Sequence, residues 1–288
     1  MEELRVKKDF TDIYKQKVPN NYLKEMQKLE YRIPDKTKPL YLSLAKQLYN
    51  KLSRTINILD IGSSYGINSA LMKYDLKMSE LDDFFLKEDT PTKKQTREFF
   101  EDQPIDKTLS FCQIDISQPA LDFSKDVQLC KKIFCINLEK DVLPINEVPP
   151  LDMIIATGCI GYIGYKAFSS LLESIKKQDS DYSKSLSQTN PIFAFSVLRI
   201  FDMEKIQKTF EDYGYSIVKS NLKPIRQRRF SDPEEKHKTV SLLHGKGIDT
   251  KKFEDHGYFY ADFYVASPKK IEPQLTIMLQ KMERCASC

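Results

Sequence analysis

The chain has 288 residues, of which 41% are hydrophobic and 30% charged, a balance typical of a soluble globular protein. Its 45 basic and 41 acidic side chains nearly cancel, so the net charge of +4 does not indicate a nucleic-acid partner. No apolar run approaches the roughly 20 residues that a membrane span requires, and the N-terminus lacks the apolar region of a signal peptide. The six cysteines form no paired CxxC units, so no zinc site is indicated, and we expect a reduced, cytoplasmic protein.

Residues 1–53 are predicted to form a helical N-terminal extension. NNYLKEMQKLEY and KPLYLSLAKQLYNKL place apolar residues at the i, i+3, i+4 spacing of helices. TINILDIG follows as a short buried strand, and NSALMKYDL as the next helix. Residues 75–108 are charged and amphipathic and carry no strand pattern, so we expect them to form an inserted helical cap.

From residue 109 onward, strand and helix patterns alternate. Further strands are predicted at 109–117, 132–139, 152–160, 191–201, 215–220 and 258–267, with helices starting near Pro119, Lys166 and Met203. Apolar strands that alternate with helices indicate a mostly parallel sheet with helices on both faces. We therefore predict an α/β sheet of seven strands. The last two strands lack a clear crossover helix between them, which leaves room for one antiparallel strand.

The predicted organisation is one domain with additions. The α/β domain spans residues 54–268 and contains the insertion at 75–108 and a second, polar and partly helical insertion at 221–257. Residues 269–288 are expected to be a C-terminal tail. The last four residues, Cys285 to Cys288, have the C-a-a-X layout of lipidated proteins, but the two internal residues are not both aliphatic, so we expect a frayed, unmodified end.

Glycine is scarce, with nine in the whole chain, and a pair of glycines follows the first strand. The segment ILDIGSSYG places Asp60, Gly62 and Gly66 in a D-x-G-x-x-x-G spacing. A tight turn at the carboxyl end of a parallel strand lets backbone N–H groups face a ligand at the next helix. A dinucleotide fingerprint would need glycines where this chain has Ser64 and Ile67, so the loop is better suited to a nucleoside without a pyrophosphate. An ordinary strand-to-helix turn is the alternative.

Three later strand ends carry further candidates. Asp115 ends the second strand, where an acidic side chain accepts hydrogen bonds from ribose hydroxyls, and a helix-capping role is its alternative. Asn137 and Leu138 end the third strand, where a polar group followed by an apolar one could hydrogen-bond and flank an adenine. Thr157 and Gly158 end the fourth, which continues into a glycine-rich segment where cofactor and acceptor would meet. Loop geometry alone is the alternative for the last two pairs.

These four segments, in this order, resemble the motifs of the class I S-adenosylmethionine (SAM)-dependent methyltransferases. ILDIGSSYG is similar to the first motif, IDISQPAL to the acidic second-strand motif, and INLEKDVLP and LDMIIATGCIGYI to the third- and fourth-strand motifs. With its helical N-terminus, helical insertion and RQRRF segment, the chain closely resembles a bacterial branch of that class over about residues 55–268. The resemblance implies a Rossmann-like domain that binds SAM and an enzyme that transfers its methyl group.

The resemblance also implies the cofactor-binding residues. By position they are Asp60, Gly62, Ser63, Ser64 and Gly66 for the methionine portion, Asp115 with Ile116 at the ribose, Asn137 and Leu138 for the adenine, and Thr157 and Gly158 beside the sulfonium. Many members of the class carry a third glycine where this chain has Ser64, so its loop contacts differ from theirs.

Methyl transfer requires the donor and acceptor to be aligned and, for an alcohol or ammonium acceptor, a proton to be removed. No residue marks a dedicated base. Tyr162 is a candidate to orient the acceptor, and Arg199 to hold a carboxylate or phosphate; each has a structural role as its alternative. Arg226, Arg228 and Arg229 are expected either to fold over the acceptor and bind an anion or to form a solvated loop.

The leading hypothesis is therefore a SAM-dependent methyltransferase for a small-molecule acceptor held under the helical insertions, without a metal. Methylation of a protein side chain and a non-catalytic SAM-binding module are the alternatives. A nucleic-acid substrate is disfavoured by the balanced charge and by the lack of a separate binding module, and the lack of an NPPY-type run at the fourth strand weighs against N-methylation of adenine or glutamine. The three histidines lie in the second insertion and are expected to be exposed.

Overall fold

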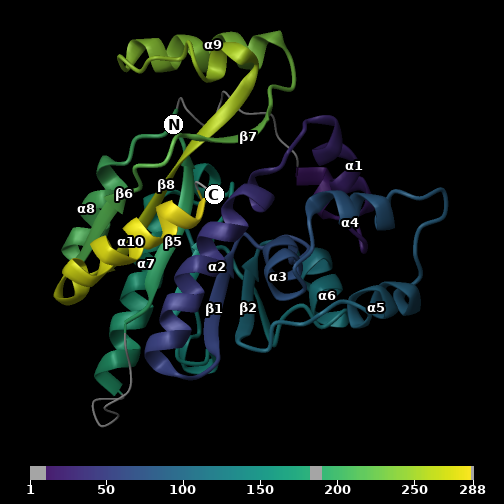
Figure 1. Ribbon diagram of the computed structural model, residues 1–288, viewed down its shortest axis with the longest axis horizontal. Helices are drawn as coiled ribbons and strands as arrows, with labels where there is room; N and C mark the ends of the chain where they lie inside the picture. Colours follow the sequence, from purple (N-terminus) through teal and green to yellow (C-terminus); the bar gives the residue numbers. More distant parts are fainter. Residues whose placement is uncertain (1–10, 182–189, 287–288) are drawn as a thin grey trace.

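The computed structural model describes residues 11–181 and 190–286 (Figure 1). Eight strands form one sheet in the order β3-β2-β1-β4-β5-β8-β6, and β7 pairs with β8. The strands β1 to β5 pair in parallel, whereas β8 runs antiparallel to β5, β6 and β7. The strands are β1 (Ile56–Ile61), β2 (Leu109–Asp115), β3 (Lys132–Cys135), β4 (Met153–Ala156), β5 (Ile192–Leu198), β6 (Tyr215–Lys219), β7 (Ile225–Arg229) and β8 (Tyr258–Pro268).

All seven predicted strands are present at their predicted positions, and the antiparallel one is β8. The eighth, β7, lies in the 221–257 segment, for which only helical and irregular structure was expected. Its pattern is hidden because its buried positions are polar: Gln227 and Arg228 face inward while Arg226 and Arg229 are exposed. A strand whose buried side chains are polar lacks the apolar alternation on which sequence-based assignment depends.

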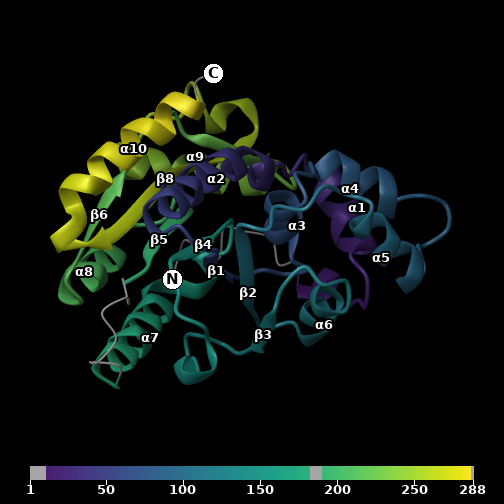
Figure 2. The ribbon, with the colours of Figure 1, turned by 60° about the horizontal axis from the view of Figure 1, so that its bottom comes forward.

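Helices cover both faces of the sheet. The helices are α1 (Asn20–Lys28), α2 (Ile33–Leu52), α3 (Ile67–Lys73), α4 (Met78–Phe85), α5 (Lys93–Glu101), α6 (Gln118–Asp126), α7 (Ile160–Asp181), α8 (Glu204–Asp212), α9 (Pro233–Gly245) and α10 (Glu272–Ala286). Figure 2 shows α2, α3 and α10 on one face and α6, α7 and α8 on the other. The predicted α/β architecture is thus confirmed. Among the described residues, no helix combines the length and the apolar character needed to cross a membrane.

Three apolar clusters hold these layers together. On one face Tyr41 of α2 packs in the cluster that contains Ile58 and Phe263 from the sheet. On the other face Phe168 of α7 belongs to the cluster of Leu59 and Phe193. Burial on both faces explains why the strands are apolar at nearly every position. The third cluster joins α1, α3, α4, α5 and α6, through residues that include Tyr22, Leu71, Leu81, Phe100 and Phe123. The inserted helices therefore pack against the N-terminal helices.

The C-terminal segment differs from the expected tail. Residues 272–286 form α10, which packs against α2 (Figure 1). Leu279 and Met282, three residues apart, are 5% and 0% exposed. This i, i+3 pair is one turn of an apolar stripe, which attaches the helix to the core. Residues 287 and 288, the end of the C-a-a-X segment, lie outside the described residues.

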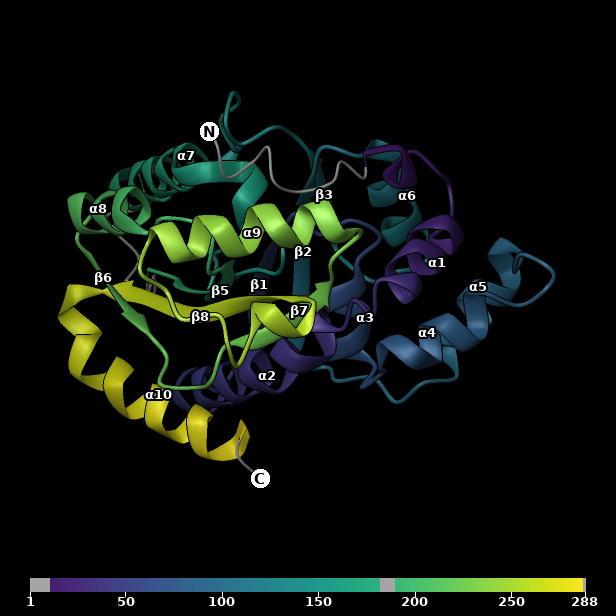
Figure 3. The same cartoon turned by 90° about the horizontal axis from the view of Figure 1, so that it is seen from above.

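The strand order reverses between β1 and β4, because the chain builds β2 and β3 on one side of β1 before β4 forms on the other. In open α/β sheets, ligands bind beyond the carboxyl ends of the strands at this switch point. Figure 3 shows α9 lying across this end of the sheet, with α1 and α4 beside it. The topology therefore favours a ligand site at the carboxyl ends of β1 and β4.

Candidate functional site

The glycine loop after β1 has an unusual backbone. Gly62, Ser64 and Gly66 all have left-handed φ angles, of 63°, 51° and 74°. Ser64 is the exception among them, since left-handed backbone is uncommon for a residue with a Cβ and occurs often at functional sites. A Cβ on Gly62 would lie 2.7 Å from the Cβ of Cys159, so the loop touches the end of β4. The loop therefore lies directly at the switch point.

Two buried oxygens in and before this loop lack a hydrogen-bond partner in the described protein. Asp60 is fully buried; its Oδ1 accepts a hydrogen bond from Asn68 Nδ2 at 3.0 Å, and its Oδ2 has no partner. The hydroxyl of Ser64 is likewise buried without a partner. Burial raises the pKa of Asp60 to about 7. An unpartnered buried oxygen costs about 1–3 kcal/mol, so such groups are typical of a site that is completed by a ligand.

Asp115, at the end of β2, is bound to this loop. Its Oδ2 accepts a hydrogen bond from the Ser64 N–H at 2.8 Å, and its Oδ1 accepts one from the Ser117 N–H at 2.9 Å. Burial raises the pKa of Asp115, while these N–H donors oppose the shift. The cap of α6 is supplied by the Ser117 hydroxyl, which accepts from the Ala120 N–H at 3.3 Å. Each carboxylate oxygen can accept a second hydrogen bond, so Asp115 retains the capacity that a ribose would use.

The third-strand edge differs in part from its prediction. The Asn137 Oδ1 accepts a hydrogen bond from the Glu139 N–H at 3.0 Å and so holds a turn. Leu138, expected to flank an adenine, is 4% exposed and packs in the apolar cluster that contains Leu59 and Phe193. The exposed apolar side chain at this edge is Ile116, at 70%. It follows Asp115 directly and offers a surface on which a flat apolar ring could lie.

At the end of β4, the predicted pair Thr157 and Gly158 is covered by residues that sequence reasoning missed. The Tyr41 hydroxyl lies 2.8 Å from the Thr157 Oγ1. A Cβ on Gly158, whose φ is 73°, would lie 2.6 Å from the Tyr31 hydroxyl and 3.4 Å from Gln227 Nε2. Tyr31 follows α1 and Gln227 lies on β7, so no local signal in the sequence could have connected them with β4.

The segment before α1 lies against the glycine loop and the end of β2. The Tyr65 hydroxyl donates to the carbonyl oxygens of Ile13 and Gln16, at 3.0 and 2.9 Å. The Ser117 hydroxyl donates to the carbonyl oxygen of Tyr14. Residues 13–16 therefore cover the same edge to which Asp60 and Asp115 contribute.

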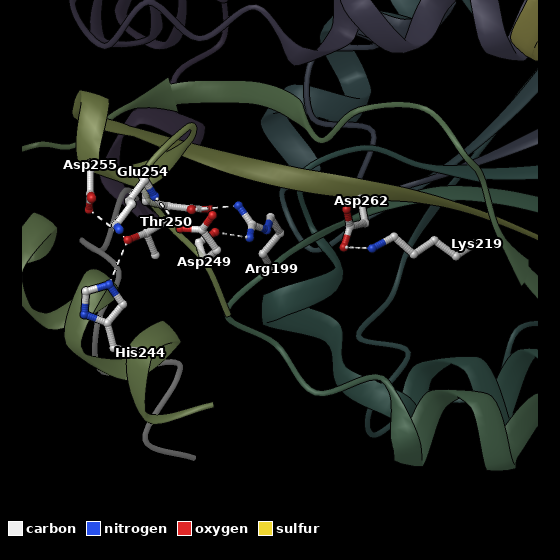
Figure 4. A network of polar contacts seen from close by, with 9 residues as sticks. Arg199, Lys219, His244, Asp249, Thr250, Glu254, Asp255 and Asp262 are labelled. Atoms are coloured by element: carbon white, nitrogen blue, oxygen red, sulfur yellow. Dashed lines mark hydrogen bonds and ion pairs between the residues drawn. The ribbon is translucent and has the colours of Figure 1, made fainter. Parts of the chain in front are cut away.

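Arg199, at the end of β5, is engaged within the protein (Figure 4). Its guanidinium lies 2.8 Å from Glu254, donates to the Asp249 carbonyl at 2.7 Å and stacks over the Phe253 ring at 4.5 Å. Burial raises the pKa of Glu254 to about 7, although Arg199 opposes the shift. These contacts support the structural alternative for Arg199. The other predicted acceptor residue, Tyr162, lies in the first turn of α7, and its side chain lies outside the described part.

Arg226, Arg228 and Arg229 do not form the anion-binding loop that was one of the two structures expected for them. Arg228 is 2% exposed and makes two hydrogen bonds to Glu235, at 2.9 and 2.7 Å. Arg229 pairs with Glu30, and Arg226 is exposed over the Tyr258 ring, 4.6 Å from its centroid. The solvated-loop expectation also fails, since the segment is a strand with one buried ion pair.

No protein-family model and no curated protein sequence matches the chain. In overall structure it is similar to the plantazolicin methyltransferase in complex with a desmethyl analogue and SAH, with 11% identity, coverage of 93% of this chain and 96% of that one, and a TM-score of 0.43. It is also similar to the magnesium protoporphyrin IX methyltransferase of Synechocystis with bound SAM, with 10% identity over 82% and 81% of the two chains and a TM-score of 0.41. A third is the precorrin-6y C5,15-methyltransferase of Geobacter metallireducens, with 10% identity, 80% and 87% coverage and a TM-score of 0.39.

Proposed function

We propose that this protein is a SAM-dependent methyltransferase that acts on a small-molecule acceptor. The observation that carries the proposal is the set of polar groups around the glycine loop. Asp60 Oδ2 and the Ser64 hydroxyl are buried without partners, and Asp115 holds the loop at the switch point of the sheet. The order of the motifs that contain these residues supports SAM in particular.

The residues present fit each part of this cofactor. The ionised form of Asp60 would face the positively charged methionine portion, and Asp115 would accept hydrogen bonds from the ribose. The exposed Ile116 would lie against the adenine, a role expected of Leu138 from the sequence. When bound, SAM supplies a methyl group on a sulfonium, which makes that carbon electrophilic. The task of the chain is then to orient the acceptor and exclude water at the end of β4.

A small acceptor is supported by what covers this end of the sheet. Tyr31 and Gln227 lie over Gly158, and residues 13–16 are bonded to Tyr65 and Ser117. Elements from three separate parts of the chain thus enclose the place where the methyl group would be transferred. A protein side chain would need a more open approach.

Calorimetry with SAM and with its demethylated product, S-adenosylhomocysteine (SAH), tests this proposal. We expect the wild type to bind both, and Asp115→Ala to lose about 2 kcal/mol of binding free energy, roughly a 30-fold fall in affinity, because hydrogen bonds to a charged acceptor are removed. Asp122→Ala is the matched control, since Asp122 is an exposed carboxylate on the nearby α6 that accepts a local hydrogen bond from Gln118.

The outcomes separate the hypotheses. Absence of SAM and SAH binding in the wild type would overturn the proposal. Binding without SAH formation from any acceptor would favour a non-catalytic SAM-binding module. Equal affinities for Asp115→Ala and Asp122→Ala would show that Asp115 only supports the loop.

A further inference from the structure

Gln227 occupies an irregular position in β7. Arg226 pairs with Tyr260 and Arg228 pairs with Phe259, and the register shifts between these two pairs, so Gln227 is the extra residue of a β-bulge. Bulges occur often beside active sites because they redirect one side chain out of the regular alternation. The bulge therefore determines the direction in which the Gln227 side chain points.

That side chain is directed at the end of β4. Its Nε2 would lie 3.4 Å from a Cβ on Gly158, and the residue is 3% exposed. The backbone carbonyl of Gln227 accepts a hydrogen bond from the Arg32 N–H at 3.1 Å, so the strand is attached to the segment after α1. The side-chain Oε1, in contrast, is buried and has no hydrogen-bond partner among the described residues. The main chain is held in place, and the side-chain oxygen remains for a ligand.

The charges nearby indicate what kind of ligand this oxygen would take. Two arginines beside Gln227 already face carboxylates: Arg228 faces Glu235, and Arg32, which donates to the Gln227 carbonyl, lies 2.7 Å from Asp82. The other chain neighbour, Arg226, is exposed and lies over the Tyr258 ring. The buried side-chain atoms without a partner in this part of the described structure include Gln227 Oε1, Asp60 Oδ2, Asp82 Oδ1 and the Ser64 hydroxyl, all of which are oxygens. Oxygens of this kind accept hydrogen bonds, and the carboxylates favour positive charge. A carboxylate or phosphate would meet these acceptor oxygens, and two neighbouring arginines, Arg228 and Arg32, are already paired.

We infer that Gln227 recognises the methyl acceptor, and that this acceptor presents an N–H or O–H group, as an amine or alcohol does, in preference to an anionic group. The inference rests on the proposed function. Gln227 Oε1 accepts the hydrogen bond of the acceptor and so orients the atom that will receive the methyl group. The residue is a positioning and specificity residue, not a base, because an amide does not take up a proton at neutral pH.

Gln227→Met tests this role, because methionine has a similar length and volume but accepts no strong hydrogen bond. The probes are two sets of compounds of matched size. The first set contains primary amines and alcohols, and the second contains carboxylates and phosphomonoesters. SAH formation is the readout. We expect turnover from the first set and a fall in kcat/KM of at least about 100-fold in Gln227→Met, since a site built to hydrogen-bond its substrate depends strongly on that bond. Gln207→Met, on the exposed face of α8, is the matched control.

Two further measurements keep this inference distinct from the proposed function. SAH affinity should be equal in the wild type and Gln227→Met; failure of the wild type to bind SAH would overturn the proposed function itself. The melting temperature of Gln227→Met should be unchanged or higher, because an unpartnered buried oxygen is removed. A melting temperature lowered by several degrees, unchanged kcat/KM, turnover only from the anionic set, or no turnover from the first set would each overturn the inference.

Discussion

Two carboxyl groups, that of Asp60 in the strand before the glycine loop and that of Glu254 between α9 and β8, are equally buried but differ in their hydrogen-bond and ion-pair partners. Their side chains are 0% and 1% exposed, and burial raises the pKa of each to about 7. Glu254 faces the guanidinium of Arg199 at 2.8 Å, whereas Asp60 receives one amide hydrogen bond and leaves Oδ2 without a partner. Burial alone therefore does not distinguish a structural carboxylate from one that binds a ligand; the partners already present do.

The largest effect should come from removing the partner of Glu254. Arg199→Met leaves this carboxyl buried without its counter-charge, and we expect the free energy of unfolding at pH 8 to fall by about 3 kcal/mol. The loss should be smaller at pH 6, because Glu254 can then take up a proton. Urea denaturation at the two pH values measures this, and the double variant with Glu254→Gln should recover much of the loss. A fall in SAH affinity without a change in stability would instead indicate that Arg199 binds a ligand and has no structural role.

A second comparison uses two glycines with similar backbones. Gly62 and Gly247 have φ angles of 63° and 71°, but a Cβ would meet Cys159 at Gly62 and nothing within 4 Å at Gly247. Both substitutions to alanine should cost about 1 kcal/mol of stability for left-handed backbone. Only Gly62→Ala should also displace the loop and lower SAH affinity, by roughly tenfold or more. Equal affinities in calorimetry would contradict the placement of the ligand at this loop.

The smallest effect is a pH dependence. The folded-state pKa of Asp60 is raised, so the stability due to its proton is complete below an ordinary pKa of about 4 and is lost as pH rises to about 7. Ionised Asp60 attracts the positive charge of SAM, so SAM affinity should increase as pH rises from 6 toward 7, by up to about tenfold per pH unit.

Asp60→Asn should flatten both profiles, the one for stability and the one for SAM affinity. Glu254→Gln should alter the pH profile of stability and leave that of SAM affinity as in the wild type. The same slope of affinity against pH in Asp60→Asn and the wild type would remove Asp60 from the proposed site.

The sheet and the glycine loop could be predicted because their signals are local. Each of the seven predicted strands is a short apolar run, and Asp60, Gly62 and Asp115 stand directly at strand ends. The Arg228–Glu235 pair was missed for the opposite reason: an arginine at a buried position of β7 is read as solvated unless its partner is known. The burial of Leu138 could not be predicted either, because a strand end does not fix which of the residues that follow it faces the core.

Tyr31 and Gln227 could not be found from the sequence at all. Each contacts the site from a chain segment distant from β4, and the RQRRF segment that contains Gln227 does not indicate a place beside β4. Gln227 is directed inward by a register shift that only the pairing of β7 with β8 produces. The residues proposed for the cofactor thus stand in local motifs at strand ends, whereas those proposed for the acceptor depend on tertiary structure.

The segment after α1 is joined to β7 by two backbone hydrogen bonds, from the Arg229 N–H to the Leu29 carbonyl and from the Arg32 N–H to the Gln227 carbonyl. These bonds couple the two segments proposed to face the acceptor, because a change in the length of either segment would shift the other. Divergence toward a new acceptor would therefore require paired changes in residues 29–32 and 226–229. Exchanging only residues 221–257 between related proteins would not transfer the preference for an acceptor.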